Sequence, residues 1–81
     1  SFEEFKDIFK RICEIKKVAF DEKGLAYLLQ EWYIKRNRKL RSNHPRDIIE
    51  QVLDVASYMN VEPAMTKELL DRACESYFVE L

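Results

Sequence analysis

Glycine, proline, cysteine and histidine are scarce in this sequence. Its 81 residues include one Gly, two Pro, two Cys and one His. Because Gly and Pro are the residues that most often end helices and form tight turns, their scarcity favours helices. The two cysteines, Cys13 and Cys74, are too few for a secreted disulfide scaffold. We interpret them as small buried apolar residues.

Long apolar runs and an excess of one charge are also missing. No stretch approaches the ~20 apolar residues of a membrane-spanning helix, and no segment has the pattern of a signal peptide. Lys and Arg together number 14 and Asp and Glu 15, which gives a net charge of −1. This balance excludes a protein that coats nucleic acid or anionic lipid with its whole surface. We therefore expect no membrane partner and a reducing, cytoplasmic location.

Motifs for catalysis and for metal binding are absent as well. The sequence has no Gly-rich phosphate loop, no HExxH and no Cys-His pair at metal-ligand spacing. We therefore expect no catalytic residue, no metal site and no enzyme in this chain alone. Its length is that of one small domain, and its first residue is Ser1 rather than Met. We expect a single helical domain over residues 1–81, part of a larger protein, with Ser1 either native or a cloning remnant.

The spacing of apolar residues predicts helices. A stripe at intervals of three and four residues covers 2–16, and Ser1 and Glu4 have the spacing of a capping box. Asp21 is a good N-cap for a second helix, whose pattern ends after Tyr33. The apolar positions of these two segments are Phe2, Phe5, Phe9, Ile12, Leu25, Leu28, Leu29 and Trp32.

Two further helices follow. Pro45 suits the first position of a third helix, with His44 as its N-cap and an apolar stripe that reaches Met59. Thr66 is the expected cap of a fourth helix, after a connection over residues 60–65. No alternating strand pattern of useful length competes with these segments. The predicted fold class is all-α, a small bundle of about four helices.

Two basic features could bind an anion. The segment Lys35–Arg41 has five positive residues in seven, which would either contact phosphates or form a solvated helix end whose cations complement the helix dipole. Arg46 falls in the first turn of the third helix, where free backbone N–H groups and a forked guanidinium suit phosphate oxygens. The alternative for Arg46 is structural: it pairs with a carboxylate of its own domain or caps a neighbouring helix.

The sequence around Arg46 resembles a known motif. Asn43-His44-Pro45-Arg46-Asp47-Ile48-Ile49 is similar to the Gly-Asn-Pro-Arg-like start of the third lid helix in several branches of the AAA+ ATPases. Residues 66–73 begin with a capping Thr and end at an Ala in the middle of the predicted helix, and they resemble the closing helix of the same lid. The resemblance to this small C-terminal lid domain covers nearly the whole chain. Asn43 and His44 stand where the family pattern has Gly and Asn.

The resemblance implies a function for the larger protein. Arg46 would match the sensor-two arginine, which reaches from the lid to the phosphates of the nucleotide, with His44 and Pro45 beside it. Arg38 and Arg41 would be accessory contacts to phosphate or to a neighbouring subunit. ATP and Mg²⁺ would be held by an upstream P-loop domain of the same chain, in an oligomeric ring. The parent protein would then be an ATPase.

Two other functions stay open from the residues themselves. A helical protein–protein interaction module without nucleotide would show an apolar surface patch away from Arg46. A helix-turn-helix nucleic-acid binder would use the basic segment and the third helix. After Arg46, however, that helix carries Asp47, Glu50 and Asp54 and no further cation, which is a poor surface for a DNA groove. We therefore do not expect a nucleic-acid partner.

Overall fold

Helices account for almost all of the regular structure. The computed structural model describes residues 1–79, and no strand occurs among them. The prediction of an all-α fold with helices in the expected places is confirmed. The elements are α1 (Phe2–Lys16), α2 (Glu22–Leu29), a π-helical segment η1 (Gln30–Ile34), α3 (His44–Met59) and α4 (Lys67–Tyr77).

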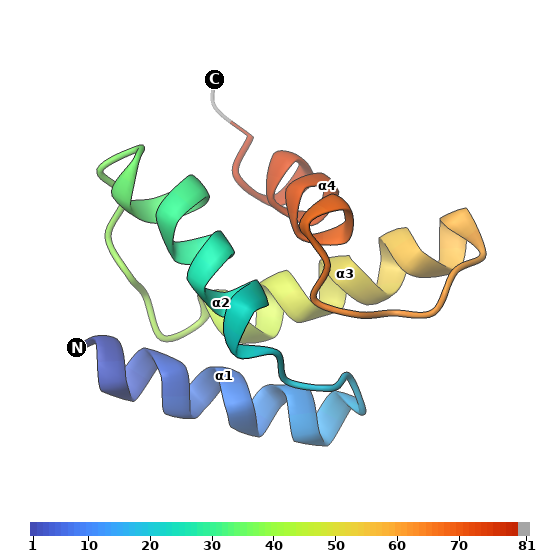
Figure 1. Ribbon diagram of the computed structural model, residues 1–81, viewed down its shortest axis with the longest axis horizontal. Coiled ribbons are helices and arrows are strands. Elements are labelled where there is room, and N and C mark those ends of the chain that lie inside the picture. The colour runs from blue at the N-terminus through green and yellow to red at the C-terminus, as the bar shows by residue number, and fades with distance from the viewer. Residues whose placement is uncertain (80–81) are drawn as a thin grey trace.

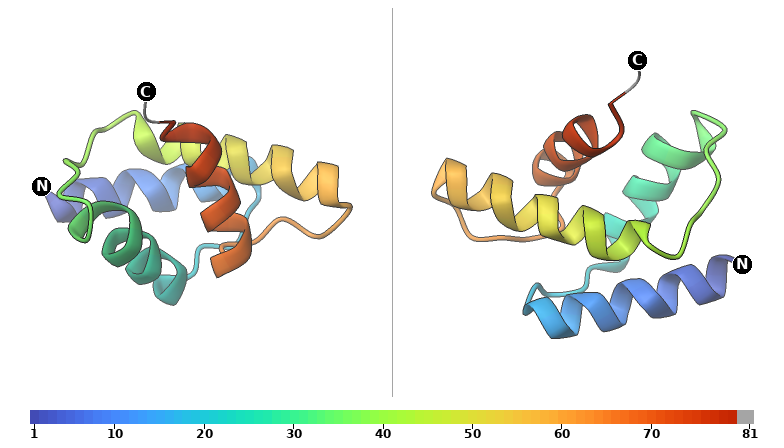
Figure 2. Two further views of the ribbon diagram at one scale, coloured as in Figure 1. Left: turned by 90° about the horizontal axis from the view of Figure 1, so that it is seen from above. Right: turned by 180° about the vertical axis from the view of Figure 1, so that it is seen from behind.

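Helix α3 occupies the middle of the bundle. It packs against α1 on one side and against α4 on the other, and α2 in turn packs against α4 (Figure 1). The views from above and from behind show α1 and α4 on different sides of α3 (Figure 2). The largest fully buried side chains lie between these helices: Tyr33, Phe9, Leu25, Leu28, Ile48, Ile49, Leu70 and Val52.

Three of the predicted helix starts are confirmed by their caps. Ser1 and Glu4 form both halves of the capping box. The Asp21 carboxylate accepts from the backbone N–H of Lys23 at 3.0 Å. The hydroxyl of Thr66 accepts from the backbone N–H of Leu69 at 3.2 Å. Each cap satisfies an N–H group that has no partner within its own helix.

The predicted N-cap of α3 is wrong by one residue. Asn43 takes that position, its side chain makes no capping hydrogen bond, and the helix begins at His44. The backbone N–H of His44 donates to the carbonyl of Arg41 at 3.1 Å. Asn43 is already in the right-handed helical region. The chain therefore turns before the helix and leads directly into it, without a side-chain cap.

The end of the second predicted helix has a wider turn than the sequence indicated. Over η1 the backbone N–H of Lys35 donates to the carbonyl of Gln30, five residues earlier, at 3.1 Å. This is the spacing of a π-helix, which is rare and short in proteins. The consecutive residues Trp32 and Tyr33 are both buried. Their apolar spacing alone is compatible with an ordinary α-helix, so the sequence did not indicate the wider turn.

Both cysteines are free and buried, as the sequence predicted. Burial raises the pKa of the Cys13 thiol to about 11 and that of Cys74 to about 12, so both are protonated at neutral pH. Within residues 1–79, none of the helices has the length and apolar character needed to cross a membrane.

Gly24 allows α2 to approach the connection before α4. A Cβ atom at position 24 would lie 2.5 Å from the carbonyl oxygen of Met65 and 2.8 Å from its Cβ. We expect Gly24→Ala to lower the free energy of unfolding by about 1–3 kcal/mol, because the clash is with backbone and outweighs alanine's better helix propensity. Urea denaturation measures this change.

The matched control for Gly24→Ala is Lys23→Ala, one residue earlier in the same helix turn. The side chain of Lys23 is exposed, so the free energy of unfolding should change by less than about 0.5 kcal/mol. Equal stability of Gly24→Ala and the wild-type chain would show that the Met65 backbone moves without cost.

Candidate functional site

The start of α3 carries the candidate anion-binding residue. His44 and Pro45 are buried, whereas Arg46 is exposed. The two residues before Arg46 therefore anchor the helix start in the core, and the guanidinium extends from it into solvent. Within residues 1–79, Arg46 has no hydrogen-bond or ion-pair partner. The structural alternative, in which Arg46 pairs with a carboxylate of its own domain, is not seen in this part of the chain.

His44 is held in an aromatic cluster. Its Nδ1 shares a hydrogen bond of 2.8 Å with the Tyr33 hydroxyl, and the rings of Tyr77 and Phe78 meet it edge-on at centroid distances of 5.7 and 5.2 Å. Burial lowers the pKa of His44, and the nearby charges of Arg41 and Arg38 lower it further. The imidazole is therefore neutral at physiological pH, and its role is to position the helix start.

A polar network joins the start of α3 to the end of α4. The Tyr77 hydroxyl donates to the Asp47 carboxylate at 2.5 Å. The Asn43 side-chain amide donates to Asp47 at 3.2 Å and to the Tyr77 hydroxyl at 3.3 Å. Burial, together with the bond to Asp47, raises the pKa of Tyr77 to about 12. The two helix ends are thereby held together beside His44.

Two arginines of the basic segment are already engaged. The guanidinium of Arg36 lies over the Trp32 ring at 4.0 Å, and its Nε donates to the carbonyl of Glu31. The guanidinium of Arg38 lies over the Phe78 ring at 3.8 Å, and its Nε donates to the carbonyl of Trp32. Both cations thus meet carbonyls at the end of a helix, as the helix-end interpretation expects.

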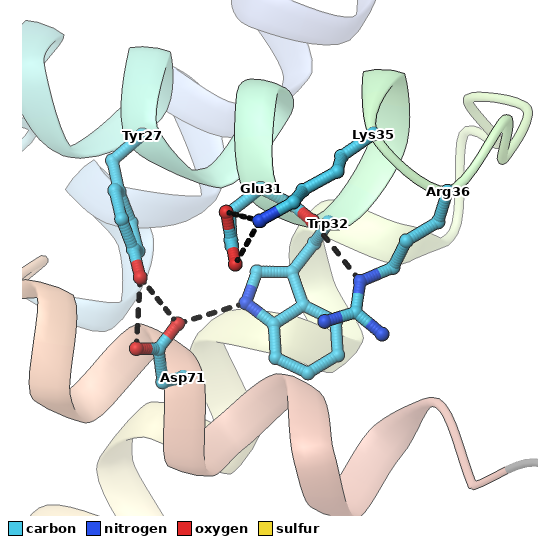
Figure 3. Close-up of polar contacts among 6 residues, drawn as sticks. All are labelled: Tyr27, Glu31, Trp32, Lys35, Arg36 and Asp71. Carbon is cyan, nitrogen blue, oxygen red and sulfur yellow. Dashed lines mark hydrogen bonds and ion pairs between the residues drawn. The ribbon is translucent and has the colours of Figure 1, made fainter.

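Asp71 of α4 lies beside the indole nitrogen of Trp32 (Figure 3). Its carboxylate accepts from the Trp32 indole N–H at 2.9 Å and from the Tyr27 hydroxyl at 2.8 and 2.9 Å. The bond to Asp71 raises the pKa of Tyr27 to about 12. Sequence reasoning missed this contact, because the apolar stripe of α4 does not show that a carboxylate at its edge meets two ring donors.

Arg41 provides a positive charge beside the α3 start. The side chains of Lys39 and Arg41 are exposed and, within residues 1–79, have no hydrogen-bond or ion-pair partner. Arg41 and Arg38 are near enough to His44 for their charges to act on its pKa. The structure thus places Arg38 and Arg41 near the residue before Pro45, on the side of the fold where α3 begins. Because Arg38 is already engaged, Arg41 is the cation of the two that suits an external anion.

Comparison with known proteins gives one assignment. The chain matches the family described as "Domain of unknown function (DUF8689)" over residues 1–76, and it belongs to that family. No curated protein and no solved structure matches the chain.

Removal of the Asp71 carboxylate should destabilise the fold. Asp71→Ala leaves the Trp32 indole and the Tyr27 hydroxyl without their acceptor, so we expect the free energy of unfolding to fall by about 1–3 kcal/mol. Urea denaturation followed by tryptophan fluorescence measures the change. Glu75→Ala, an exposed carboxylate one turn further along α4, should leave stability unchanged. Similar losses in the two variants would contradict the role of Asp71.

Stability should fall as the pH decreases through the histidine range. The pKa of His44 is lowered in the folded chain, so below the unfolded value of about 6.5 the unfolded chain binds a proton that the folded chain does not. The contribution of neutral His44 to the free energy of unfolding is fully present above that pH and is lost toward pH 5. The free energy of unfolding then changes by at most about 1.4 kcal/mol per pH unit, the slope for one proton.

His44 is the single histidine of the chain, which makes the measurement specific. Urea denaturation between pH 5 and pH 8 gives the slope, and one-dimensional NMR of the imidazole gives the folded pKa directly. His44→Gln should abolish the slope in this range. A folded pKa at or above the unfolded value would contradict the expected direction.

Proposed function

We propose that this domain is the C-terminal lid of an AAA+ ATPase and that Arg46 contacts the phosphates of the bound nucleotide. The observation that carries the proposal is the placement of Arg46: an exposed guanidinium that has no partner within residues 1–79, on a helix start anchored by buried His44 and Pro45. A guanidinium with no partner in the described chain is available for an external anion. The Pro-Arg resemblance in the sequence supports phosphate as that anion.

The residues present suit a phosphate group chemically. Arg46 offers a planar fork of donors, which matches phosphate oxygens. The first turn of α3 adds the backbone N–H of Arg46 and the positive end of a helix dipole, because the N–H groups of His44 and Asp47 already donate to backbone carbonyls. Arg41, exposed and near His44, adds a second positive charge. Arg38 is engaged with Phe78 and Trp32, so Arg41 is the better candidate for an accessory contact.

The nucleotide with its Mg²⁺ would be held by an upstream P-loop domain, and its phosphates supply the negative charge that Arg46 meets. Arg46 would stabilise that charge while the lid is closed. Because Asp47 and Asn43 bind Tyr77 of α4, a displacement of the α3 start would carry α4 with it. The lid would therefore move as a rigid body when the contact is lost.

The setting of this proposal is a larger protein. Its parts are a P-loop domain in the same chain, neighbouring subunits in a ring, and the cytoplasm as the compartment. The free, buried thiols of Cys13 and Cys74 suit a reducing compartment. The parent protein would be the ATPase, and this domain alone would not hydrolyse ATP.

Substitution of Arg46 in the parent protein tests the proposal. We expect Arg46→Ala to lower the rate of ATP hydrolysis by about tenfold or more, because a charged donor to the phosphates is lost. Arg46→Lys keeps the charge but not the fork and should retain part of the rate. Steady-state hydrolysis with a coupled assay measures both.

The matched control is Arg11→Ala on α1, because Arg11 is exposed and has no partner within the described chain. It should leave hydrolysis unchanged. An unchanged rate in Arg46→Ala would overturn the sensor assignment. A reading frame without a Gly-rich phosphate loop upstream of residue 1 would overturn the lid proposal as a whole.

A second candidate function has its own observation. Phe2 and Ile34 are large apolar residues on the surface, 45% and 68% exposed, and both line a cavity at the surface. Such exposure is typical of a protein–protein contact. A nucleic-acid role has no comparable support. The carboxylate of Asp54 on α3 is exposed and, within residues 1–79, unpaired, so this helix presents a negative charge that is unsuited to a DNA groove.

A further inference from the structure

An apolar groove lies between the start of α1 and η1. Its main part is a cavity of about 520 Å³, and smaller cavities of about 250 and 140 Å³ share lining residues with it. We call this surface the Ile34 groove. Its apolar lining consists of Phe2, Leu29, Tyr33, Ile34 and Leu40. A volume of this size accepts a small organic molecule, so a single aromatic side chain fits within it.

The unpaired charge at the rim of the Ile34 groove is positive. Arg41 lines the smaller cavity that shares Leu40 with the main one, and within residues 1–79 its side chain has no hydrogen-bond or ion-pair partner. Glu4 and Glu22 also line the flanking cavities, but each of these carboxylates is already in an ion pair. A ligand for this groove would therefore combine an apolar side chain with carboxylates.

A surface of the opposite kind lies between the second half of α3 and α4. Tyr58 is 92% exposed there, beside a cavity of about 540 Å³ lined also by Asp54, Glu75 and Arg72. The guanidinium of Arg72 is already in an ion pair within its own helix. Asp54 is one helical turn before Tyr58 and so shares its face. Neither carboxylate has a partner among the described residues. We call Tyr58, Asp54 and Glu75 the Tyr58 surface.

The Ile34 groove and the Tyr58 surface lie at opposite ends of the molecule. The basic segment and the C-terminal end of α3 are far apart in Figure 1 and again in the view from behind in Figure 2. Two different, complementary surfaces at opposite ends favour a head-to-tail contact, in which each copy uses one surface toward each neighbour. A two-fold contact centred on the groove would instead bring its own cations together.

We propose that the Tyr58 surface of one copy docks in the Ile34 groove of the next. The phenol ring fills the apolar cavity, and Asp54 and Glu75 face Arg41 across the contact. The partner is a second copy of this chain because both halves of the complementary pair are present on it. The proposal shares Arg41 with the accessory phosphate contact but does not depend on Arg46, so substitution of Arg46 distinguishes it from the nucleotide contact.

Sedimentation velocity over a range of chain concentrations at low salt tests the contact. The wild-type chain should increase in average mass beyond the dimer, because a head-to-tail contact leaves a free surface at each end. Tyr58→Ser and Ile34→Glu should each weaken self-association by at least about tenfold. High salt should also weaken it, because exposed charges are screened. Circular dichroism checks that both variants keep the helical fold.

Mixing the two variants gives the sharpest result. Tyr58→Ser retains the groove and Ile34→Glu retains the Tyr58 surface, so an equimolar mixture has one competent pair of surfaces. The mixture should form a 1:1 complex with near wild-type affinity and stop at the dimer. A double variant carrying both substitutions lacks both surfaces, so it should bind neither single variant and should stay monomeric alone.

Two control variants show whether a loss of association is specific to these surfaces. Ile15→Glu removes an aliphatic residue of α1 that is 56% exposed and lies outside both surfaces, and it should associate like the wild-type chain. Arg46→Ala should also associate normally, whatever its effect on ATP hydrolysis.

Three results would overturn the proposal. They are a wild-type chain that stays monomeric at every concentration, a Tyr58→Ser chain that associates as well as the wild type, and a mixture of the two variants that forms no complex.

Discussion

The burial of His44 against Tyr33 is the contact on which the arrangement at the start of α3 depends. The hydrogen bond between them joins the end of the second helical segment to the first residue of α3. Tyr77 and Phe78 close the same cluster from the end of α4. Three parts of the chain that are distant in sequence thus meet at one ring. Arg46 follows two residues later, so its backbone has a fixed place in α3 while its side chain is exposed.

The basic segment Lys35–Arg41 contains cations of two kinds, those that lie over aromatic rings and those that do not. Arg36 and Arg38 lie over Trp32 and Phe78 and bind backbone carbonyls. These contacts use the guanidinium faces and the Nε donors, and they hold the segment against the helices. Lys39 and Arg41 lie outside this arrangement and are exposed. A run of like charges thus has structural members and members that are available for ligands.

The residues of α3 that carry the two proposals are separated along that helix, whereas Arg41 has a part in both proposals. The first turn of α3 carries Arg46, and its last turns carry Asp54 and Tyr58. Because a 16-residue helix rises about 1.5 Å per residue, these groups are well separated along its axis. A nucleotide at Arg46 and a neighbouring copy at Tyr58 would not compete for surface. The nucleotide and the neighbouring copy would both contact α3.

Local patterns in the sequence were sufficient for the helices and most of their starts. The apolar spacing and the capping residues Ser1, Asp21 and Thr66 act within one helical turn, so they can be read without knowledge of the fold. The buried, inert cysteines followed in the same way from their positions on apolar stripes. The candidate Arg46 also came from the sequence, because a Pro-Arg helix start is a local feature.

Contacts between segments that are distant in the sequence were revealed only by the tertiary structure. The contact of Tyr33 with His44 and the acceptor role of Asp71 toward Trp32 join residues that are 11 and 39 positions apart. The division of the basic segment into engaged and available cations requires the ring of Phe78, 40 residues from Arg38. The spacing of apolar residues in the sequence indicates the period of a helix, but it does not indicate how far apart two helices lie. That distance determines which polar side chains form contacts with each other.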